Sequence, residues 1–140
     1  MNISFFLTPK NEVAYENISS NMRQAMEKIE YHGYTAIPIL DDKGRYVGTL
    51  TDGDLLAKLK KTKNLDFSNT HEVMLKEIEM RTTNKAVSID ANIEDLMLIS
   101  INQNFVPVVD DSKIFIGIIK RSDIITYCYK KLFKQEHETK

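Results

Sequence analysis

The sequence is short of the features that mark secreted, membrane-bound or nucleic-acid-binding proteins. Its 140 residues include a single cysteine, Cys128, so no disulfide can form within the chain. The formal net charge of −1 gives no overall electrostatic reason to bind nucleic acid or an anionic membrane. No run approaches the roughly 18 apolar residues of a membrane-spanning helix, and the N-terminus lacks the basic region and apolar core of a secretory signal. These absences predict a protein of the cytoplasm.

Motifs for catalysis and metal binding are also missing. The sequence has no phosphate loop of the form G-x-x-x-x-G-K-[ST] and no apparent Ser-His-Asp or Cys-His arrangement. The histidines, His32, His71 and His137, have no partner at the spacing typical of zinc ligands. We therefore expect no enzyme activity, no metal and no required cofactor.

What the sequence does contain is an internal repeat. Residues that constrain the backbone or carry charge recur at one offset of 69 positions (107 − 38, 117 − 48 and 123 − 54). The pairs are Pro38 and Pro107, Gly48 and Gly117, and Asp54 and Asp123. Because repeated landmarks indicate a repeated structural unit, we expect two copies of one fold.

Each copy shows the same order of periodic segments. The first copy is predicted to have a short strand at 12–15, a helix from 22 that is capped by Ser20 or Asn21 and ended by Gly33, strands at 36–40 and 46–50, and a helix at 52–61. The second is predicted to have a strand at 87–89, a helix at 93–102, strands at 106–109 and 114–119, and a helix at 122–134. The predicted class is mixed α/β (α+β), with two β-α-β-β-α motifs.

We divide the chain after residue 69. Residues 1–69 hold an N-terminal segment, the first motif with its core at 12–61, and a linker at 62–69; residues 70–140 hold the second motif, with its core at 86–134, and a C-terminal tail. Thr70 is expected to cap one helical turn before the second motif. Neither motif alone can cover both faces of its sheet, so we expect the two to stack about a pseudo-twofold axis that creates two related clefts.

The ordered landmarks resemble those of the cystathionine-β-synthase (CBS) motif pair, or Bateman module. Ile37-Pro-Ile-Leu-Asp41 and Val106-Pro-Val-Val-Asp110 carry the apolar-Pro-apolar-apolar-Asp pattern, and a glycine-containing strand and a helix with an early aspartate follow each. The resemblance covers about residues 12–134. More narrowly, residues 33–41 and 102–107 resemble small stand-alone CBS pairs of Gram-positive bacteria, some of which bind AMP or cyclic di-AMP. The resemblance implies a sensor of an adenine nucleotide that regulates a protein partner.

The resemblance also implies two clefts, each combining the helix start of one motif with strands of the other. In the favoured cleft, the residues implied around the adenine are Ala14, Tyr34, Thr35, Ala36 and Pro38, and those implied on the ribose and phosphate are Lys120, Arg121 and Asp123. One carboxylate can accept hydrogen bonds from both ribose hydroxyls, and a cation at a helix start suits phosphate. Lys120 stands where the family usually has Ser or Thr, which is compatible with a more anionic, two-phosphate ligand.

The second cleft is expected to be closed. Its implied residues are Thr51, Asp54, Val87, Asn104, Phe105 and Pro107. Phe105 places a bulky ring where the family usually has a small residue. The spacing from helix start to proline is also shorter, since Ile93 and Pro107 lie 14 residues apart (107 − 93) and Met22 and Pro38 lie 16 apart (38 − 22). We therefore expect one nucleotide per chain.

Structural explanations stay open for the same residues. Thr51 and Asp54 have the spacing of a capping box, and Asp123 suits the first turn of a helix through the helix dipole. Lys120 with Arg121 could be a solvated surface pair. A second hypothesis needs no ligand at all: the exposed face of the last helix, with Ile125, Tyr129 and Phe133, would form a homodimer in a protein-interaction module.

Overall fold

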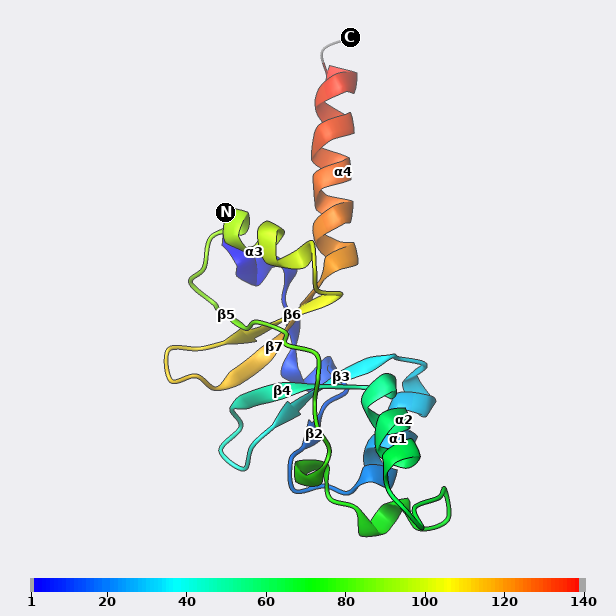
Figure 1. Ribbon diagram of the computed structural model, residues 1–140. Coiled ribbons are helices and arrows are strands. Elements are labelled where there is room, and N and C mark those ends of the chain that lie inside the picture. The colour runs from blue at the N-terminus through cyan, green and yellow to red at the C-terminus, as the bar shows by residue number, and fades with distance from the viewer. Residues whose placement is uncertain (1, 139–140) are drawn as a thin grey trace. The chain divides into compact units, whose positions relative to one another are not determined.

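The computed structural model describes residues 2–138, with side chains to residue 134. Contacts between residues divide this part of the chain into two compact units, and each is described by itself (Figure 1). The first-repeat unit comprises Ala14–Asn84 and Lys113–Phe115. The second-repeat unit comprises the residues to Val13, Lys85–Ser112 and the residues from Ile116 onward. The mixed α+β class and the doubled β-α-β-β-α order agree with the sequence prediction.

The first-repeat unit is a three-stranded sheet with two helices. Its elements are β2 (Glu16–Asn17), α1 (Met22–His32), β3 (Ala36–Leu40), β4 (Tyr46–Thr51), α2 (Asp52–Lys61) and the 3₁₀ turns η3 (Thr70–Glu72) and η4 (Leu75–Glu77). The strand order is β2-β3-β4, with β2 parallel and β4 antiparallel to β3. Thr51 pairs with Ala36, so the last residue of β4, which leads into α2, lies opposite the first residue of β3.

The ends of α1 follow the local signals in the sequence. The side chain of Asn21 accepts a hydrogen bond from the N–H of Gln24, and the side chain of Gln24 accepts one from the N–H of Asn21, both at 2.9 Å. This reciprocal capping box satisfies N–H groups that the first turn leaves free. Gly33 ends the helix with a left-handed φ of 68°, a conformation that costs glycine little. The predicted N-cap at Asn21 and stop at Gly33 are confirmed.

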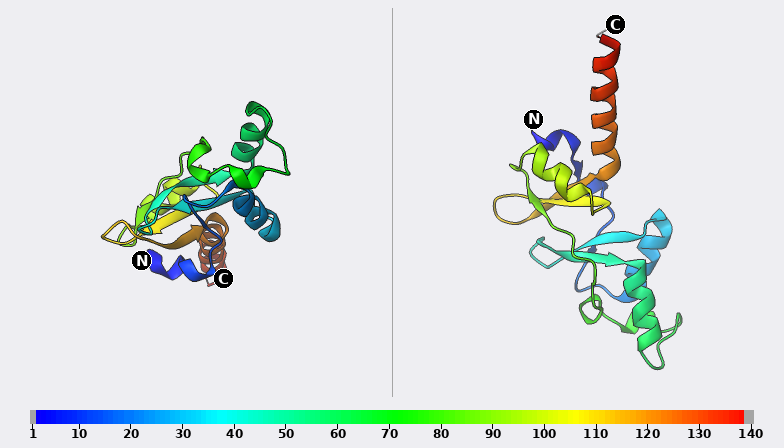
Figure 2. Two further views of the ribbon diagram at one scale, coloured as in Figure 1. Left: turned by 90° about the horizontal axis from the view of Figure 1, so that it is seen from below. Right: turned by 45° about the horizontal axis from the view of Figure 1, so that its top comes forward.

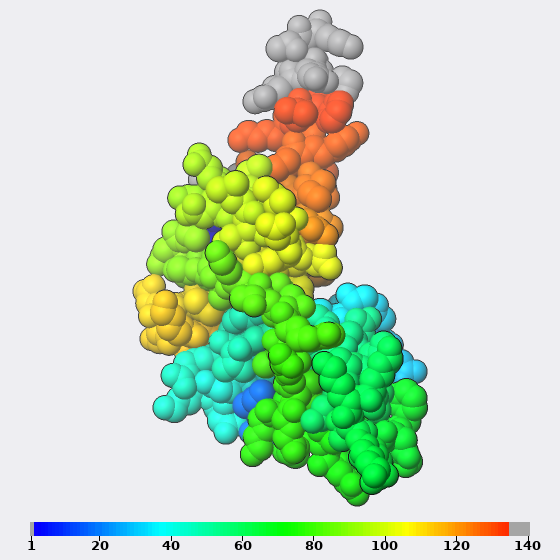
Figure 3. Space-filling view, viewed as in Figure 1, coloured from blue at the N-terminus to red at the C-terminus, as the bar shows by residue number. Residues whose placement is uncertain are grey.

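The segment after α2 completes the core of the first-repeat unit. Leu75 and Ile78 are buried in the same cluster as Ile37 of β3. The guanidinium of Arg23 donates to the carbonyl oxygen of Ser68 at 2.6 Å and to the hydroxyl of Thr70 at 3.3 Å. The expected single helical turn capped by Thr70 is therefore wrong, because the apolar residues and Arg23 draw this segment onto the unit as two 3₁₀ turns. Figure 3 shows this green segment along the unit's surface.

The second-repeat unit repeats this plan with one more strand. Its elements are η1 (Ile3–Phe6), β1 (Thr8–Pro9), η2 (Lys10–Glu12), β5 (Val87–Ser88), α3 (Ile93–Ser100), β6 (Phe105–Val109), β7 (Phe115–Lys120, whose first residue groups with the other unit) and α4 (Arg121–Glu138). The strand order is β1-β7-β6-β5. The α4 helix extends well past the sheet of its own unit (Figure 2). Among the described residues, no helix is both long and apolar enough to cross a membrane.

The N-terminal segment belongs to the second-repeat unit. β1 pairs antiparallel with β7, and the ring of Phe6 packs edge-on against that of Tyr127 with 5.1 Å between their centroids. The strand expected at 12–15 is wrong. The strand lies at 16–17 instead, where Glu16 pairs with Ile39 of β3.

The repeated glycine has the same use in both units. A Cβ added to Gly117 would lie 2.2 Å from the carbonyl oxygen of Thr8 in the paired strand β1. A Cβ added to Gly48 would lie 2.9 Å from the methyl carbon of Met80. Each glycine therefore admits a segment that crosses close to its strand. The two neighbours differ, because a paired backbone is fixed whereas the end of a methionine side chain can move.

This difference predicts unequal effects of two matched substitutions. We expect Gly117→Ala to lower the free energy of unfolding by about 2–3 kcal/mol and Gly48→Ala by less than about 1 kcal/mol, since overpacking is costly where neighbours cannot relax. Urea unfolding measures both, and amide exchange should show lost protection at β1 only for Gly117→Ala. Equal losses in the two variants would contradict the steric explanation.

Candidate functional site

A main-chain hydrogen bond sets the geometry of the predicted site residues in each unit. The N–H of Asp52 donates to the carbonyl oxygen of Thr35 at 3.0 Å, and the N–H of Arg121 donates to that of Asn104 at 3.0 Å. The two donors are 69 residues apart (121 − 52), and so are the two acceptors (104 − 35), which is the offset of the repeat. Each unit therefore brings the start of its second helix against the start of its own central strand.

In the first-repeat unit, part of the predicted adenine wall is accessible. Tyr34 and Thr35 are exposed and Ala36 is half-buried. The ring of Tyr34 stacks on that of His32, with 5.3 Å between centroids and 10° between planes. Pro38 is buried, and Ala14 packs against the unit's core. Tyr34, Thr35 and Ala36 thus form a small polar and aromatic surface at the start of β3.

In the second-repeat unit, the matching polar side chains, Gln103 and Asn104, are hydrogen-bonded to other residues of the unit. Gln103, which corresponds to Tyr34, is buried and bonds to both the N–H and the C=O of Lys85, at 2.7 and 3.1 Å. The side-chain oxygen of Asn104 accepts a hydrogen bond from the guanidinium of Arg121. Phe105 is half-buried, and Val87 and Pro107 are buried.

Lys120 and Arg121, the basic pair where α4 begins, differ in their contacts. Arg121 points its guanidinium at the carbonyl oxygens of Ser100 and Ile101, each at 3.5 Å, where α3 ends. A cation there interacts favourably with the helix dipole. Lys120 and Asp123 are exposed, and within the described residues neither side chain has a hydrogen bond or ion pair. Of the three predicted ribose and phosphate ligands, Lys120 and Asp123 therefore have their polar groups accessible.

The predicted capping box at the start of α2 is confirmed. The hydroxyl of Thr51 accepts from the N–H of Asp54, and the carboxylate of Asp54 accepts from the N–H of Thr51, both at 3.0 Å. The Asp54 side chain is only 1% exposed. These bonds satisfy free N–H groups of the first turn.

Arg81 is a site residue that sequence reasoning missed. Its Nε lies 3.1 Å from the carboxylate of Asp54, and its backbone N–H donates to the same oxygen at 3.3 Å. Asp54 is therefore occupied within its own unit. A small cavity of about 270 Å³ lies beside this ion pair, lined by side chains of both charges, including Lys58, Glu77 and Glu79. No sequence signal identifies Arg81, because it lies 27 residues after Asp54 in an irregular segment.

The repeated acidic turns are structural. Asp41 accepts from the N–H groups of Lys43 and Arg45, both at 2.9 Å, and the bond from Arg45 holds the pKa of Asp41 below its usual range. Asp110 likewise accepts from the N–H of Ser112. Among the described side chains, which do not include that of His137, no three His, Cys, Asp or Glu residues gather as metal ligands would.

Most of the sequence matches one known protein family. The model of the CBS domain matches residues 8–61 and 75–130, which together are most of the chain. The chain belongs to the CBS domain family. The resemblance drawn from the repeated landmarks is thereby confirmed.

Individual relatives match this chain over most of their own length. The chain is 26% identical over 120 residues to the cyclic di-AMP receptor B of Bacillus subtilis (strain 168), covering 86% of this chain and 81% of the relative. The crystal structure of CbpB in complex with c-di-AMP has a TM-score of 0.84 at 22% identity, with 99% and 91% of the two chains covered. That of CBSX2 in complex with AMP has a TM-score of 0.70 at 25% identity, with 92% and 96% covered.

The ion pair at Asp54 can be tested through stability. Replacing Arg81 by Met keeps most of the aliphatic stem but leaves the buried carboxylate with main-chain and capping bonds alone. We expect the free energy of unfolding to fall by about 1–2 kcal/mol, a modest value because the guanidinium is half exposed. Chemical denaturation measures it, with Lys61→Met, from the same cavity wall, as the control. A loss no larger than that of the control would show that the pair contributes nothing.

Proposed function

We propose that this CBS pair is a non-catalytic regulatory module that binds an adenine nucleotide in the cytoplasm and signals its presence to a protein partner. Cyclic di-AMP is the first ligand to test, with AMP, ADP and ATP as alternatives. The observation that carries the proposal is membership of the CBS family together with similarity, over most of both chains, to a receptor named for cyclic di-AMP.

The contacts proposed for the nucleotide are the accessible members of the set implied by the sequence. Thr35 and Ala36, with Tyr34 beside them, offer a small polar surface to the adenine. Asp123, whose carboxylate has no ion pair among the described side chains, offers an acceptor to the ribose hydroxyls, and Lys120 offers an ammonium group to phosphate. Ala14 and Pro38 would shape the wall from beneath. Arg121 would act through Asn104, holding the start of α4 in place.

Binding at a single cleft is supported by the contrast between the two repeats. In the second cleft, Asp54 would have to release Arg81 before it could accept a ribose, and Asn104 would have to release Arg121. Breaking charge-assisted bonds of this kind opposes ligand binding. In the part of the chain that the structure describes, the side chains of Thr35 and Asp123 have no such bond to break. We therefore propose one nucleotide per chain.

Calorimetric titration tests the nucleotide assignment. We expect cyclic di-AMP to bind with one site per chain, and Asp123→Asn to weaken binding by about 10- to 100-fold, the value of bonds to a charged acceptor. Asp52→Asn is the matched control, because Asp52 is also exposed in a first helical turn. No heat with any of the four nucleotides, or equal affinity for wild type and Asp123→Asn, would contradict the assignment.

A second observation favours self-association. Ile125, Tyr129, Leu132 and Phe133 recur at helical spacing on α4 and are 60%, 61%, 60% and 41% exposed. Contiguous exposed apolar side chains of this kind mark interaction surfaces. We propose that this face of α4 pairs with a second copy of the chain to form a homodimer.

Light scattering after size exclusion tests the dimer. We expect a mass of two chains for wild type, and at least about 30-fold weaker association for Tyr129→Glu, as for a central aromatic residue of an interface. Tyr31→Glu is the control, since Tyr31 is 85% exposed on α1. A wild-type monomer, or a Tyr129→Glu dimer as stable as the control, would contradict this face as the interface.

A further inference from the structure

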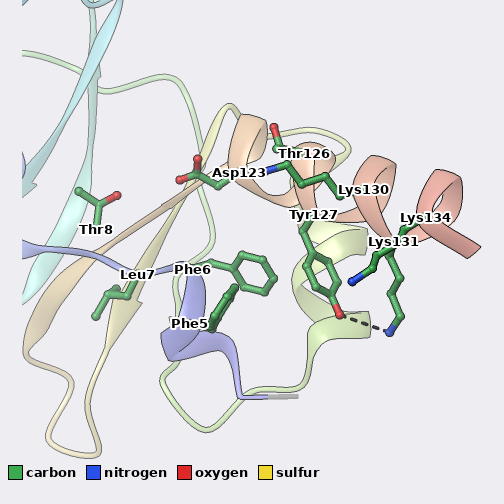
Figure 4. Close-up of a pocket in the computed structure, with 10 residues that line it drawn as sticks. All are labelled: Phe5, Phe6, Leu7, Thr8, Asp123, Thr126, Tyr127, Lys130, Lys131 and Lys134. Carbon is green, nitrogen blue, oxygen red and sulfur yellow. Dashed lines mark hydrogen bonds between the residues drawn. The ribbon is translucent and has the colours of Figure 1, made fainter.

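A second face of α4 lines a groove that the nucleotide assignment does not explain. The groove lies within the second-repeat unit, between α4 and the N-terminal segment, and has a volume of about 700 Å³. Three aromatic residues, Phe5, Phe6 and Tyr127, and three lysines, Lys130, Lys131 and Lys134, are among the side chains that line it (Figure 4). These residues are distinct from the four apolar residues proposed for the homodimer.

The groove combines apolar surface with positive charge. Phe5 is 75% exposed although its ring contacts that of Phe6, at 5.5 Å between centroids. Lys131 lies 5.6 Å from the centre of the Tyr127 ring and 3.3 Å from its hydroxyl. Within the described residues, Lys130 and Lys134 have no ion-pair partner. Three ammonium groups within little more than one helical turn attract an anionic occupant.

The shape of the groove favours an extended or helical chain segment. Most of the lining residues are themselves exposed, so a small molecule would stay largely in water, whereas sites for small ligands bury most of the ligand. A flat membrane would not fit a concave surface between two walls. Asp123, at the Thr8 end of the lining, would also repel an anionic membrane.

We propose that this groove docks an acidic segment of a partner protein that carries at least one large apolar side chain. The apolar residue would cover Phe5 and Phe6, and acidic residues would pair with Lys130 and Lys134. Asp123 gives the segment a direction, because its carboxylate excludes acidic residues from that end. The proposal rests on the proposed regulatory function only in requiring that a partner exists.

Peptide display against the full chain tests the docking surface. We expect selection from a random library to enrich peptides with Asp or Glu beside Leu, Phe or Trp, and fluorescence anisotropy of the enriched peptides to show affinity that falls as salt rises. The double variant Lys130→Glu with Lys134→Glu should weaken binding at least about tenfold, and Phe5→Ala by several-fold. The matched control is Lys63→Glu with Lys76→Glu, which makes the same charge change at exposed lysines outside the groove.

Several results would overturn the proposal. The first two are enrichment of neutral or basic peptides and no enrichment at all. The third is a peptide affinity of the Lys130 and Lys134 double variant that equals that of the control variant. Sedimentation with vesicles containing phosphatidylserine provides a further arm, because groove-dependent vesicle binding without peptide binding would assign the surface to a membrane. Titration of the same variants with cyclic di-AMP separates the two proposals. A variant that still binds cyclic di-AMP but has lost peptide binding shows that the groove, and not the nucleotide site, was affected.

Discussion

In each repeat, one main-chain hydrogen bond between the start of the second helix and the start of the central strand determines which groups stay free to bind a ligand. It joins Asp52 to Thr35 in one unit and Arg121 to Asn104 in the other, at the same length of 3.0 Å. Because it uses one N–H of the helix's first turn, the remaining N–H groups depend on side chains or on a ligand. Thr51 and Asp54 supply those side chains in the first repeat. In the second, Lys120 stands at the position of Thr51 and has no acceptor to offer.

The loss of two residues before β6 explains why the two repeats differ. α1 has 11 residues and ends in a glycine cap, whereas α3 has 8 and no glycine follows it. The last carbonyl oxygens of α3 therefore need another donor, and Arg121 supplies it. Arg121 in turn engages the side chain of Asn104, which leaves that residue less free than its counterpart Thr35. The shortened helix and the occupied wall of the second repeat are thus parts of one structural change.

Local patterns predicted most of the fold but few of the side-chain partners. The helices and strands followed from periodicity, and their ends from Asn21, Gly33 and Thr51, because caps act within three residues along the chain. The N-terminal strand β1 was missed, and the two 3₁₀ turns after α2 were predicted as one helical turn, because both segments take their structure from contacts with distant elements. Arg81 was missed for the same reason, since nothing beside it in the sequence points to Asp54. The shorter spacing of the second repeat predicted a difference between the two clefts, which stays a prediction, whereas the contacts of Arg121 at the end of α3 follow only from the structure.

Asp123 connects the two proposed roles of the second-repeat unit. It is the carboxylate assigned to the ribose, and it also lines the end of the groove assigned to an acidic segment. A nucleotide bound to this carboxylate would change the charge and shape of the groove's end, so the two proposed sites would be coupled in affinity. Such coupling is reciprocal: any factor by which the nucleotide strengthens or weakens the partner's affinity must also apply to the nucleotide's affinity when the partner is bound. If both proposals hold, Asp123 at the first turn of α4, which has no ion pair within the described chain, would link nucleotide binding to partner binding without a large rearrangement of the fold.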